Sequence, residues 1–256
     1  MFSITDDGPI RWLTIDNPAR RNAVPPGEWG NLADRLQDFA TSEQRALVII
    51  GAGSDFCSGA DLAAGFALQG GATMAYEAMR PLNRAARTLY ELDKPKVAAV
   101  DGAAVGAGMN LALGCDIVIA SHRARFSEIF VRRGLVVDFG GTWLLPRRIG
   151  LARAKELALT GRMLGAEEAL RYGLAAEVVA PEDLKRRAGE VAAELAAAAP
   201  LAQHVVKMGL DHAFEMSFDE ALEYEAQAQA QCLTSEDVIE GVSAFLQKRP
   251  PQFKGR

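Results

Sequence analysis

Short apolar runs alternate with amphipathic stretches along the first half of the chain. Three of these runs, at 46–50, 97–100 and 117–120, are apolar almost throughout and are bounded by polar or turn residues. Runs of this kind are typical of strands buried on both faces of a sheet. Apolar residues at helical spacing predict helices at about 27–41 and 72–92 between them.

Alternation of strands with helices predicts an α/β fold with a mainly parallel sheet, and a ligand outside the carboxyl ends of its strands. Two further elements fit this scheme. Residues 2–6 and 10–15 flank an Asp-Gly-Pro turn and predict a hairpin, and 125–127 predicts a short strand.

From Thr142 onward the pattern is helical almost throughout. The predicted helices lie at 142–149, 151–160, 165–171, 182–199, 201–215, 217–233 and 236–248. We therefore expect two regions, an α/β core over 1–190 and a helical C-terminal region over 191–256.

Two glycine-rich turns of similar design follow two of the apolar runs. The first, GAGSDFCSGADL (51–62), is expected to open a helix, and the second, Gly102 to Gly108, precedes an apolar helix over 109–115. The first N–H groups of a helix lack backbone partners and carry partial positive charge, so they can hold an oxygen that is or becomes negative. Either turn alone is equally consistent with a tight connection packed with small residues.

Composition narrows the possible functions. The chain has 256 residues and a net charge of −5, which gives no indication of a nucleic-acid surface. Neither a signal peptide nor an apolar run long enough to span a membrane is evident. The cysteines are widely spaced and the histidines show no metal spacing, so we expect reduced thiols, no metal site and a cytoplasmic location.

Five motifs together resemble the crotonase, or enoyl-CoA hydratase/isomerase, superfamily. They are NPARRNAV (17–24), GAGSDFCSGADL (51–62), DGAAVGAGMNLALGCDIVIAS (101–121), GLVVDFGGTWLLPRRIG (134–150) and EDVIEGVSAFLQKRPPQFKGR (236–256). The resemblance implies a crotonase-like spiral of repeated ββα units with a C-terminal helical trimerisation region. It also implies a homotrimer or a dimer of trimers.

The resemblance implies an acyl-CoA thioester as substrate, with no cofactor beyond the coenzyme A that the substrate carries. The thioester oxygen would lie between the N–H groups of Ala60 and Ala107, which form an oxyanion hole. Proton removal beside the thioester builds negative charge on that oxygen, and fixed donors stabilise it.

The residues expected in the pocket point away from ordinary water addition. Hydratases of this family use two glutamates, and their positions here hold Asn110 and Phe130, neither of which can exchange a proton as a carboxylate does. The remaining acid is Asp138, and this pattern resembles the enoyl-CoA isomerases of phenylacetate breakdown, the 1,2-epoxyphenylacetyl-CoA isomerase type. Asp138 would take a proton from C2 of a 3-enoyl thioester and return it at C4.

Several alternatives stay open at this point. Asp138 could instead cap the helix that begins near Gly141 or lie in a solvated loop. Glu128 is the one nearby acid that could join Asp138 in an atypical hydratase, although strand alternation could turn it away from the pocket. A protein that binds acyl-CoA without turning it over would also keep the two turns.

The resemblance also places the coenzyme A. Its implied contacts are Arg21, Asn22, Ala23, Ser58, Asp61, Leu62, Phe253 and Lys254. The last two belong to a C-terminal tail that, in this family, sometimes reaches the nucleotide of a neighbouring subunit. Residues 63–80 contain several glycines, and we expect them to form a movable lid over the acyl chain.

Overall fold

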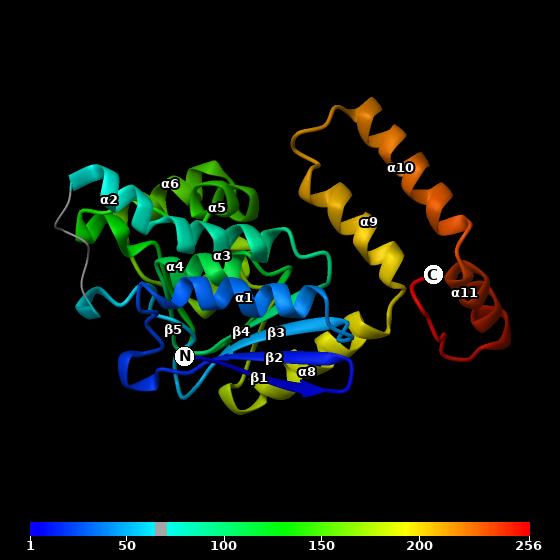
Figure 1. The fold of residues 1–256 in the computed structure, drawn as a ribbon, viewed down its shortest axis with the longest axis horizontal. Coiled ribbons are helices and arrows are strands. Elements are labelled where there is room, and N and C mark those ends of the chain that lie inside the picture. The colour runs from blue at the N-terminus through cyan, green and yellow to red at the C-terminus, as the bar shows by residue number, and fades with distance from the viewer. Residues whose placement is uncertain (65–70) are drawn as a thin grey trace.

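A computed structural model describes residues 1–64 and 71–256, and its centre is a twisted six-stranded sheet (Figure 1). The strand order is β1-β2-β3-β4-β6-β9, antiparallel between β1 and β2 and parallel thereafter. The strands are β1 (Phe2–Asp7), β2 (Ile10–Ile15), β3 (Ala46–Gly51), β4 (Lys96–Val100), β6 (Ile117–Ser121) and β9 (Glu177–Val179). The predicted hairpin and the three predicted buried strands are confirmed. β9 lies in the stretch between the helices predicted at 165–171 and 182–199, which the sequence left unassigned, and its three residues are too short a run to predict a strand.

A second, three-stranded sheet lies beside the carboxyl ends of the first. Its order is β5-β7-β8, with bounds β5 (Ala103–Val105), β7 (Arg125–Ser127) and β8 (Leu164–Gly165). The sequence predicted β7 but read β5 as part of a glycine turn. Pairing with β7 makes those three residues a strand, and a pairing partner more than 20 residues away leaves no local signal.

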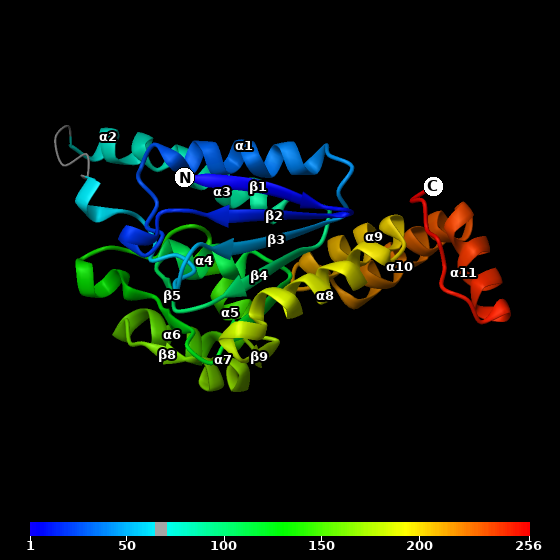
Figure 2. The same ribbon diagram turned by 90° about the horizontal axis from the view of Figure 1, so that it is seen from below.

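Helices cover both faces of the main sheet, as Figure 2 shows. On β3, Leu47 and Ile49 face α1 (Glu28–Ala40) and α3 (Arg80–Tyr90), whereas Ala46 and Val48 face α8 (Leu184–Ala197). Successive side chains of a strand point to opposite faces, so a run that is apolar throughout needs a cover on each side. The boundary expected at 190 falls inside α8, whose buried residues continue to Ala196 and belong to the sheet's packing.

The predicted helix over 72–92 is two helices, α2 (Gly71–Ala78) and α3, with Met79 between them. Pro81 occupies the first turn of α3, where its missing N–H costs nothing, and this favours a new helix start there. The helix expected after the first glycine turn is a 3₁₀ turn, η2 (Leu62–Ala64), in the described part of the chain. Six residues of the expected lid, 65–70, lie outside the described residues.

The remaining helices extend the core and then leave it. They are α4 (Ala107–Leu113), α5 (Gly141–Ile149), α6 (Leu151–Thr160), α7 (Ala166–Tyr172), α9 (Pro200–Asp211), α10 (Phe218–Leu233) and α11 (Glu236–Gln247), with 3₁₀ turns η1 (Pro18–Arg20), η3 (Ile129–Arg133) and η4 (Pro181–Asp183). Figure 1 shows α9, α10 and α11 standing away from the sheet on one side. Among the described residues, no helix has the length and apolar character needed to cross a membrane.

Candidate active site

The two glycine turns meet at one edge of the main sheet. β3 and β4 are parallel neighbours, so the segments that follow them leave the same edge. The first turn then pairs with β5: the Cys57 N–H donates to the Ala103 carbonyl at 2.8 Å, and the Val105 N–H donates to the Cys57 carbonyl at 3.0 Å. This pairing brings Ala60 beside the start of α4.

Two glycines permit that close approach. A Cβ on Gly108 would lie 2.1 Å from the Cys57 carbonyl oxygen, which no side chain can tolerate. Gly59 has φ +89°, and a Cβ there would lie 2.7 Å from the Val105 oxygen and 3.4 Å from the Ala107 nitrogen. The backbones of the two turns are therefore in direct contact, which explains why both turns are rich in glycine.

The N–H groups of Ala60 and Ala107 are free to face a ligand. The Val24 N–H donates to the Gly59 carbonyl at 2.8 Å, and the Val24 carbonyl accepts from the Asp61 N–H at 2.9 Å. Backbone groups alternate in direction along an extended segment, so the Ala60 N–H points away from Val24, toward the second turn. Ala107 is the first residue of α4 and has no partner in its own helix. Within the described residues neither group donates to a backbone carbonyl, and both belong to the two turns that are in contact.

Two acidic residues lie beside Asn110, which is one turn along α4 from Ala107. Asn110 is fully buried, and its Nδ2 donates to the Asp138 backbone carbonyl at 2.9 Å and to Glu128 Oε2 at 3.4 Å. Residues three apart on a helix are neighbours on its surface, so Asn110 and Ala107 face the same region. We call Asn110, Glu128 and Asp138 the carboxyl pocket.

Both acids of the carboxyl pocket hold protons unusually tightly. Burial raises the pKa of Glu128 to about 8; the Asn110 amide opposes this shift, and the charge of Asp138 adds to it. Burial also raises the pKa of Asp138 to about 7. Such a carboxyl is half protonated near neutrality and can both accept and return a proton.

Two expectations about these acids change with the structure. Glu128 points into the pocket because strand geometry stops at Ser127: Glu128 has φ −83° and ψ 63° and precedes the 3₁₀ turn η3, so alternation no longer applies. Asp138 does not cap α5. Gly140 is the residue before that helix, and only the backbone carbonyl of Asp138 bonds to it, accepting from the Gly141 N–H at 2.9 Å.

Two further contacts, which the sequence did not predict, shape the pocket. The ring of Phe130 is buried, 3.5 Å from where a Cβ on Gly106 would lie, so it packs against the second turn. A Cβ on Gly141 would lie 2.3 Å from Asn110 Nδ2, so only glycine lets α5 begin against the amide. The paired glycines at 140 and 141 were the only sequence signal for this contact.

Three of the residues expected along the coenzyme, Arg21, Asn22 and Ala23, lie on one loop, but they differ in exposure. Asn22 is fully buried: its Oδ1 accepts from the Asn17 N–H at 2.9 Å, and its Nδ2 donates to the carbonyls of Ala52 and Asp55. Its side chain is occupied in shaping the loop and is not free to touch a ligand. Ala23 is buried beside it, whereas Arg21 is exposed.

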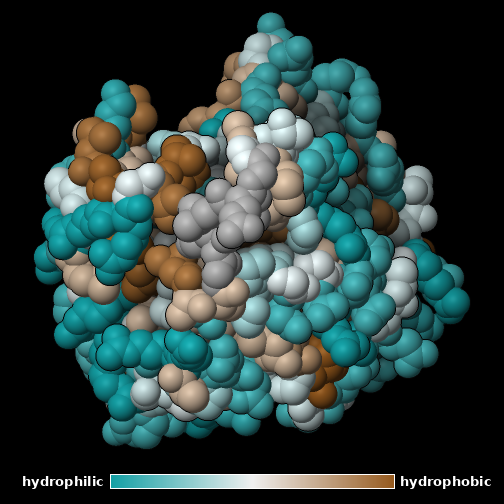
Figure 3. Space-filling model, turned by 60° about the vertical axis from the view of Figure 1, so that its left-hand side comes forward, coloured by the Kyte–Doolittle hydropathy of each residue, from teal (hydrophilic) through white to brown (hydrophobic). Residues whose placement is uncertain are grey.

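The first turn completes this strip of surface. The Ser58 N–H donates to the Arg21 carbonyl at 3.0 Å, and Asp61 Oδ1 accepts from the Ala63 N–H at 3.0 Å, which caps η2. Leu62 is 44% exposed. Exposed apolar side chains also occur on α2, at Met74 and Tyr76, and on η3 and the segment after it, at Val131, Leu135 and Val136. Figure 3 shows apolar side chains on the face that turns the left-hand side of Figure 1 toward the viewer.

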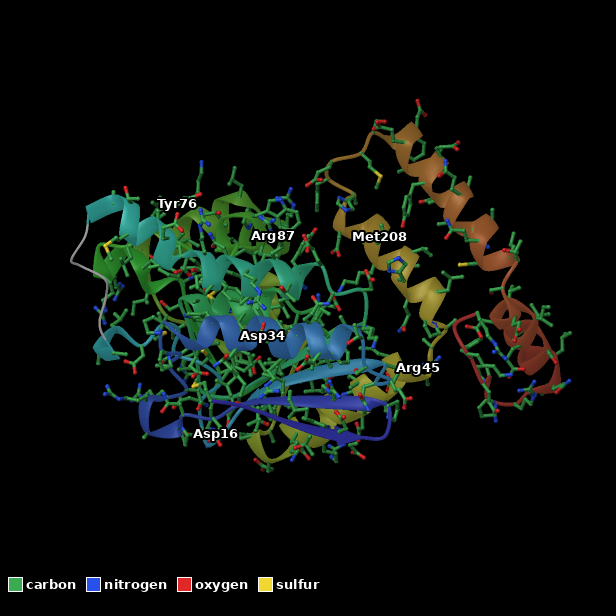
Figure 4. All side chains as sticks on the ribbon, in the orientation of Figure 1. Asp16, Asp34, Arg45, Tyr76, Arg87 and Met208 are labelled. Atoms are coloured by element: carbon green, nitrogen blue, oxygen red, sulfur yellow. The ribbon has the colours of Figure 1, made fainter. Side chains whose placement is uncertain are left out.

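The C-terminal tail lies at the opposite edge of the sheet from the glycine turns. Arg45 immediately precedes β3, and its Nη2 donates to the Phe253 carbonyl at 2.8 Å. Figure 4 labels Arg45 at that end and Tyr76 of α2 at the other. The backbone N–H of Lys254 donates to Asp237 Oδ1 at 2.6 Å, which holds the tail on α11. Within one chain, Phe253 and Lys254 therefore do not meet Ala60 or Ala107.

The chain matches known proteins over nearly its whole length. The family model described as enoyl-CoA hydratase/isomerase matches residues 6–256. A protein of Rhodobacter capsulatus named "Probable enoyl-CoA hydratase" is 42% identical over 95% of this chain and 94% of its own length. The 1,2-epoxyphenylacetyl-CoA isomerase of Escherichia coli is 40% identical over 96% of this chain and 95% of its own.

Solved structures agree with the fold. An enoyl-CoA hydratase from Polaromonas superposes with a TM-score of 0.93 at 32% identity and covers 99% of each chain. An enoyl-CoA hydratase from Bacillus anthracis gives 0.94 at 30% identity, over 100% of this chain and 99% of its own. Together with the paired glycine turns, these matches show that the chain belongs to the enoyl-CoA hydratase/isomerase family, with the crotonase fold and an acyl-CoA thioester as its class of substrate.

Proposed function

We propose that this protein is an enoyl-CoA isomerase in which Asp138 moves a proton between carbon atoms of the substrate. The observation that carries the proposal is the carboxyl of Asp138, which has a pKa of about 7. The backbone carbonyl of Asp138 accepts from Asn110 on α4, the helix that begins with the Ala107 N–H. The two positions where hydratases of the family hold glutamates are an amide, Asn110, and a buried ring, Phe130.

The proposed reaction has two proton transfers. The Asp138 carboxylate accepts a proton from C2 of a 3-enoyl thioester, and the electron pair moves onto the thioester oxygen as an enolate. The N–H groups of Ala60 and Ala107 hold that oxygen, and each such donor is worth about 3 kcal/mol in the transition state. Asp138 then returns the proton at C4, which leaves the double bond between C2 and C3.

Two substrates fit this chemistry. One is a linear 3-enoyl-CoA, and the other is the ring epoxide of phenylacetyl-CoA, which the 40% identity to 1,2-epoxyphenylacetyl-CoA isomerase supports together with a place in phenylacetate breakdown. Arg21 and the strip formed by Ser58, Asp61 and Leu62 would hold the coenzyme. Phe253 and Lys254 would reach the nucleotide only from a second copy of the chain.

Self-association as a homotrimer or a dimer of trimers is part of the proposal. The helices α9, α10 and α11 carry many exposed apolar side chains that the chain itself does not cover. They are Val206, Met208, Leu210, Phe214, Phe218, Leu222, Leu233, Ile239, Val242, Phe245 and Leu246. Sedimentation equilibrium at several protein concentrations tests this, and a purely monomeric protein would contradict it.

A hydratase with an unusual carboxyl pair is the second candidate, and Glu128 favours it. Asn110 Nδ2 donates to Glu128 Oε2 and to the backbone carbonyl of Asp138, so both acids lie beside this amide. One of them could activate a water molecule and the other could supply a proton. Crotonyl-CoA is the discriminating substrate, because it can be hydrated but has no 3-enoyl double bond to shift. If the enzyme hydrates crotonyl-CoA to 3-hydroxybutyryl-CoA faster than it isomerises a 3-enoyl-CoA, this candidate is favoured.

The decisive test follows protons directly. A 3-enoyl-CoA is incubated in deuterated water with wild type, Asp138→Asn and Glu167→Gln, the last being an exposed acid used as a control. NMR should show the 2-enoyl product with wild type and the control, and almost none with Asp138→Asn. Equal conversion by all three would move the base away from Asp138. Tight thioester binding with no conversion and no deuterium uptake would favour a non-catalytic acyl-CoA-binding protein.

A further inference from the structure

Three buried oxygen atoms of the carboxyl pocket lack a hydrogen-bond partner among the described residues. They are Asn110 Oδ1, Glu128 Oε1 and Asp138 Oδ1, one from each residue. All three are acceptors as long as both carboxyls are ionised, so the cluster lacks donors rather than acceptors. A buried acceptor without a donor is destabilising, and a proton on one carboxyl supplies the missing O–H.

The two carboxyls are not equivalent candidates for that proton. Glu128 is completely buried, and its one bond, from Asn110 Nδ2, is long at 3.4 Å. Asp138 is half-buried and lies on a segment whose preceding residues are exposed. Water can stabilise an ionised Asp138 but not an ionised Glu128, so the proton belongs on Glu128.

We propose that Glu128 keeps its proton beside Asp138 and is a positioning residue that confines the negative charge of the pocket to Asp138. This inference rests on the proposed isomerase function. With Glu128 neutral, the pocket carries one negative charge before proton transfer, on Asp138, and one after it, on the enolate. An ionised Glu128 would add a second charge next to the enolate and oppose its formation.

The other charged side chains near Glu128 are bonded to other groups or exposed to solvent, so they do not favour its ionised form. On its own side, Arg132 Nε donates to the Thr160 carbonyl at 2.9 Å, and Arg133 is exposed. The helix α4 carries no charged side chain. Glu156 on α6 and Arg162, just after that helix, form an ion pair with each other, with 2.6 Å between Arg162 Nε and Glu156 Oε1.

On α5, the two arginines of the last turn are engaged elsewhere. Arg147 lies over the Trp143 ring, and Arg148 donates to the carbonyls of Leu113 and Asp116. Asp138 is thus the one charged group acting on Glu128 in the described part of the chain, and it favours the protonated form.

A particular pH dependence follows from this arrangement. Activity should rise as Asp138 ionises near pH 7 and fall again as Glu128 ionises near pH 8. At pH 9, kcat/KM of the wild type should be about sevenfold below its maximum. Glutamine keeps the size and neutral charge of protonated glutamate, so Glu128→Gln should retain the acid limb and stay within about twofold of its maximum from pH 8 to pH 9.

The test combines kinetics with a measurement that needs no turnover. We would record kcat/KM against pH for wild type, Glu128→Gln, Glu128→Met and the exposed control Glu167→Gln. Infrared difference spectra, wild type minus Glu128→Gln on protein with ¹³C-labelled glutamate, should show a protonated glutamate carbonyl at pH 7 that disappears above pH 8. Glu128→Met supplies a second neutral side chain if the glutamine variant does not fold.

Each outcome separates the two claims. Loss of the alkaline limb in both neutral variants, with the infrared band in wild type, supports the role of Glu128. Absence of the band at pH 7, or an unchanged alkaline limb in both variants, overturns the inference. If the band is present but wild type converts no enoyl-CoA at any pH, the proposed isomerase function fails instead.

Discussion

The carboxyl pocket and a lysine cluster, formed by Lys96, Asp116 and Lys207, both bury charged groups, but they satisfy them differently. In the lysine cluster Asp116 faces two ammonium groups, Lys207 Nζ at 2.9 Å and Lys96 Nζ at 3.8 Å. Its Oδ2 also accepts from the Lys96 backbone N–H at 2.8 Å. Lys96, only 1% exposed, donates to the Leu89 carbonyl at 2.6 Å.

The lysine cluster ties elements together and leaves none of its own side-chain polar atoms buried without a partner. It joins the last turn of α3, the start of β4 and the helix α9, at the opposite edge of the sheet from the glycine turns. The carboxyl pocket instead places two acids together and leaves three oxygen atoms without donors. Opposite charges with complete hydrogen bonding indicate a structural role, whereas two neighbouring acids with unsatisfied oxygen atoms indicate chemistry.

The largest expected effect is on catalysis. Asp138→Asn should lower kcat/KM for 3-enoyl-CoA by about 10³-fold, or about 4 kcal/mol, because the amide cannot accept the C2 proton. Its free energy of unfolding should not fall, because the substitution removes a largely buried charge that has no opposite charge beside it. Steady-state kinetics and urea denaturation measure the two quantities, and a large loss of stability would mean that Asp138 is structural after all.

The second prediction is a loss of stability without a loss of activity. Asp116→Asn should lower the free energy of unfolding by about 3 kcal/mol, because it leaves the buried Lys96 without an opposite charge. The folded fraction should keep kcat/KM within about threefold, since the lysine cluster lies away from the glycine turns. Asp6→Asn, which breaks the surface pair with Arg11, is the matched control and should cost less than about 1 kcal/mol in urea. If Asp116→Asn and Asp6→Asn lowered the free energy of unfolding equally, the lysine cluster would have no special structural role.

A third effect concerns stability against pH in the carboxyl pocket. The unfolded chain releases the Glu128 proton near pH 4.5, whereas the folded protein holds it to about pH 8. The folded state therefore binds more protons between these values, and its stability falls as pH rises. Between pH 6.5 and pH 8, the free energy of unfolding of Glu128→Gln should rise by about 2 kcal/mol relative to that of the wild type, as measured by urea denaturation. A constant difference would show that Glu128 is ionised in the folded protein.

The smallest effect has the opposite sign and belongs to the lysine cluster. Burial lowers the pKa of Lys96 from 10.5 to about 8, so between these values the unfolded chain binds more protons and stability rises with pH. From pH 9 to pH 10 the wild type should gain about 1 kcal/mol relative to Lys96→Met, which lacks this ionisation. Parallel stability curves for the two proteins would place the Lys96 ammonium in water.

Much of the fold was predictable because its signals are local. The buried runs at 46–50, 97–100 and 117–120 are strands, and the expected helices of the second half are present with small shifts of their ends. The short strands β5, β8 and β9 were not predictable. Two or three residues become a strand only through a partner far away in the sequence, and no propensity marks such a pairing in advance.

The candidate site divides in the same way. The glycine turns around Ala60 and Ala107 could be placed from sequence, because strained backbone requires glycine and its spacing is visible. The burial of Glu128 could not, since one residue decides whether the strand continues past Ser127 or turns into η3. Asn22 was expected to touch coenzyme A, but its side chain is used up by three bonds within its own loop.

The sequence by itself determined the family and the parallel core, and it singled out Asp138 as the candidate acid, because periodicity, glycine spacing and residue chemistry are properties of short segments. The tertiary structure alone decided that Asn110 bonds to both Glu128 and Asp138, that their oxygen atoms lack donors, and that the tail lies at the far edge of the sheet. Burial and electrostatic coupling depend on which distant residues meet. That is why the protonation of the carboxyl pocket became visible only in the folded chain.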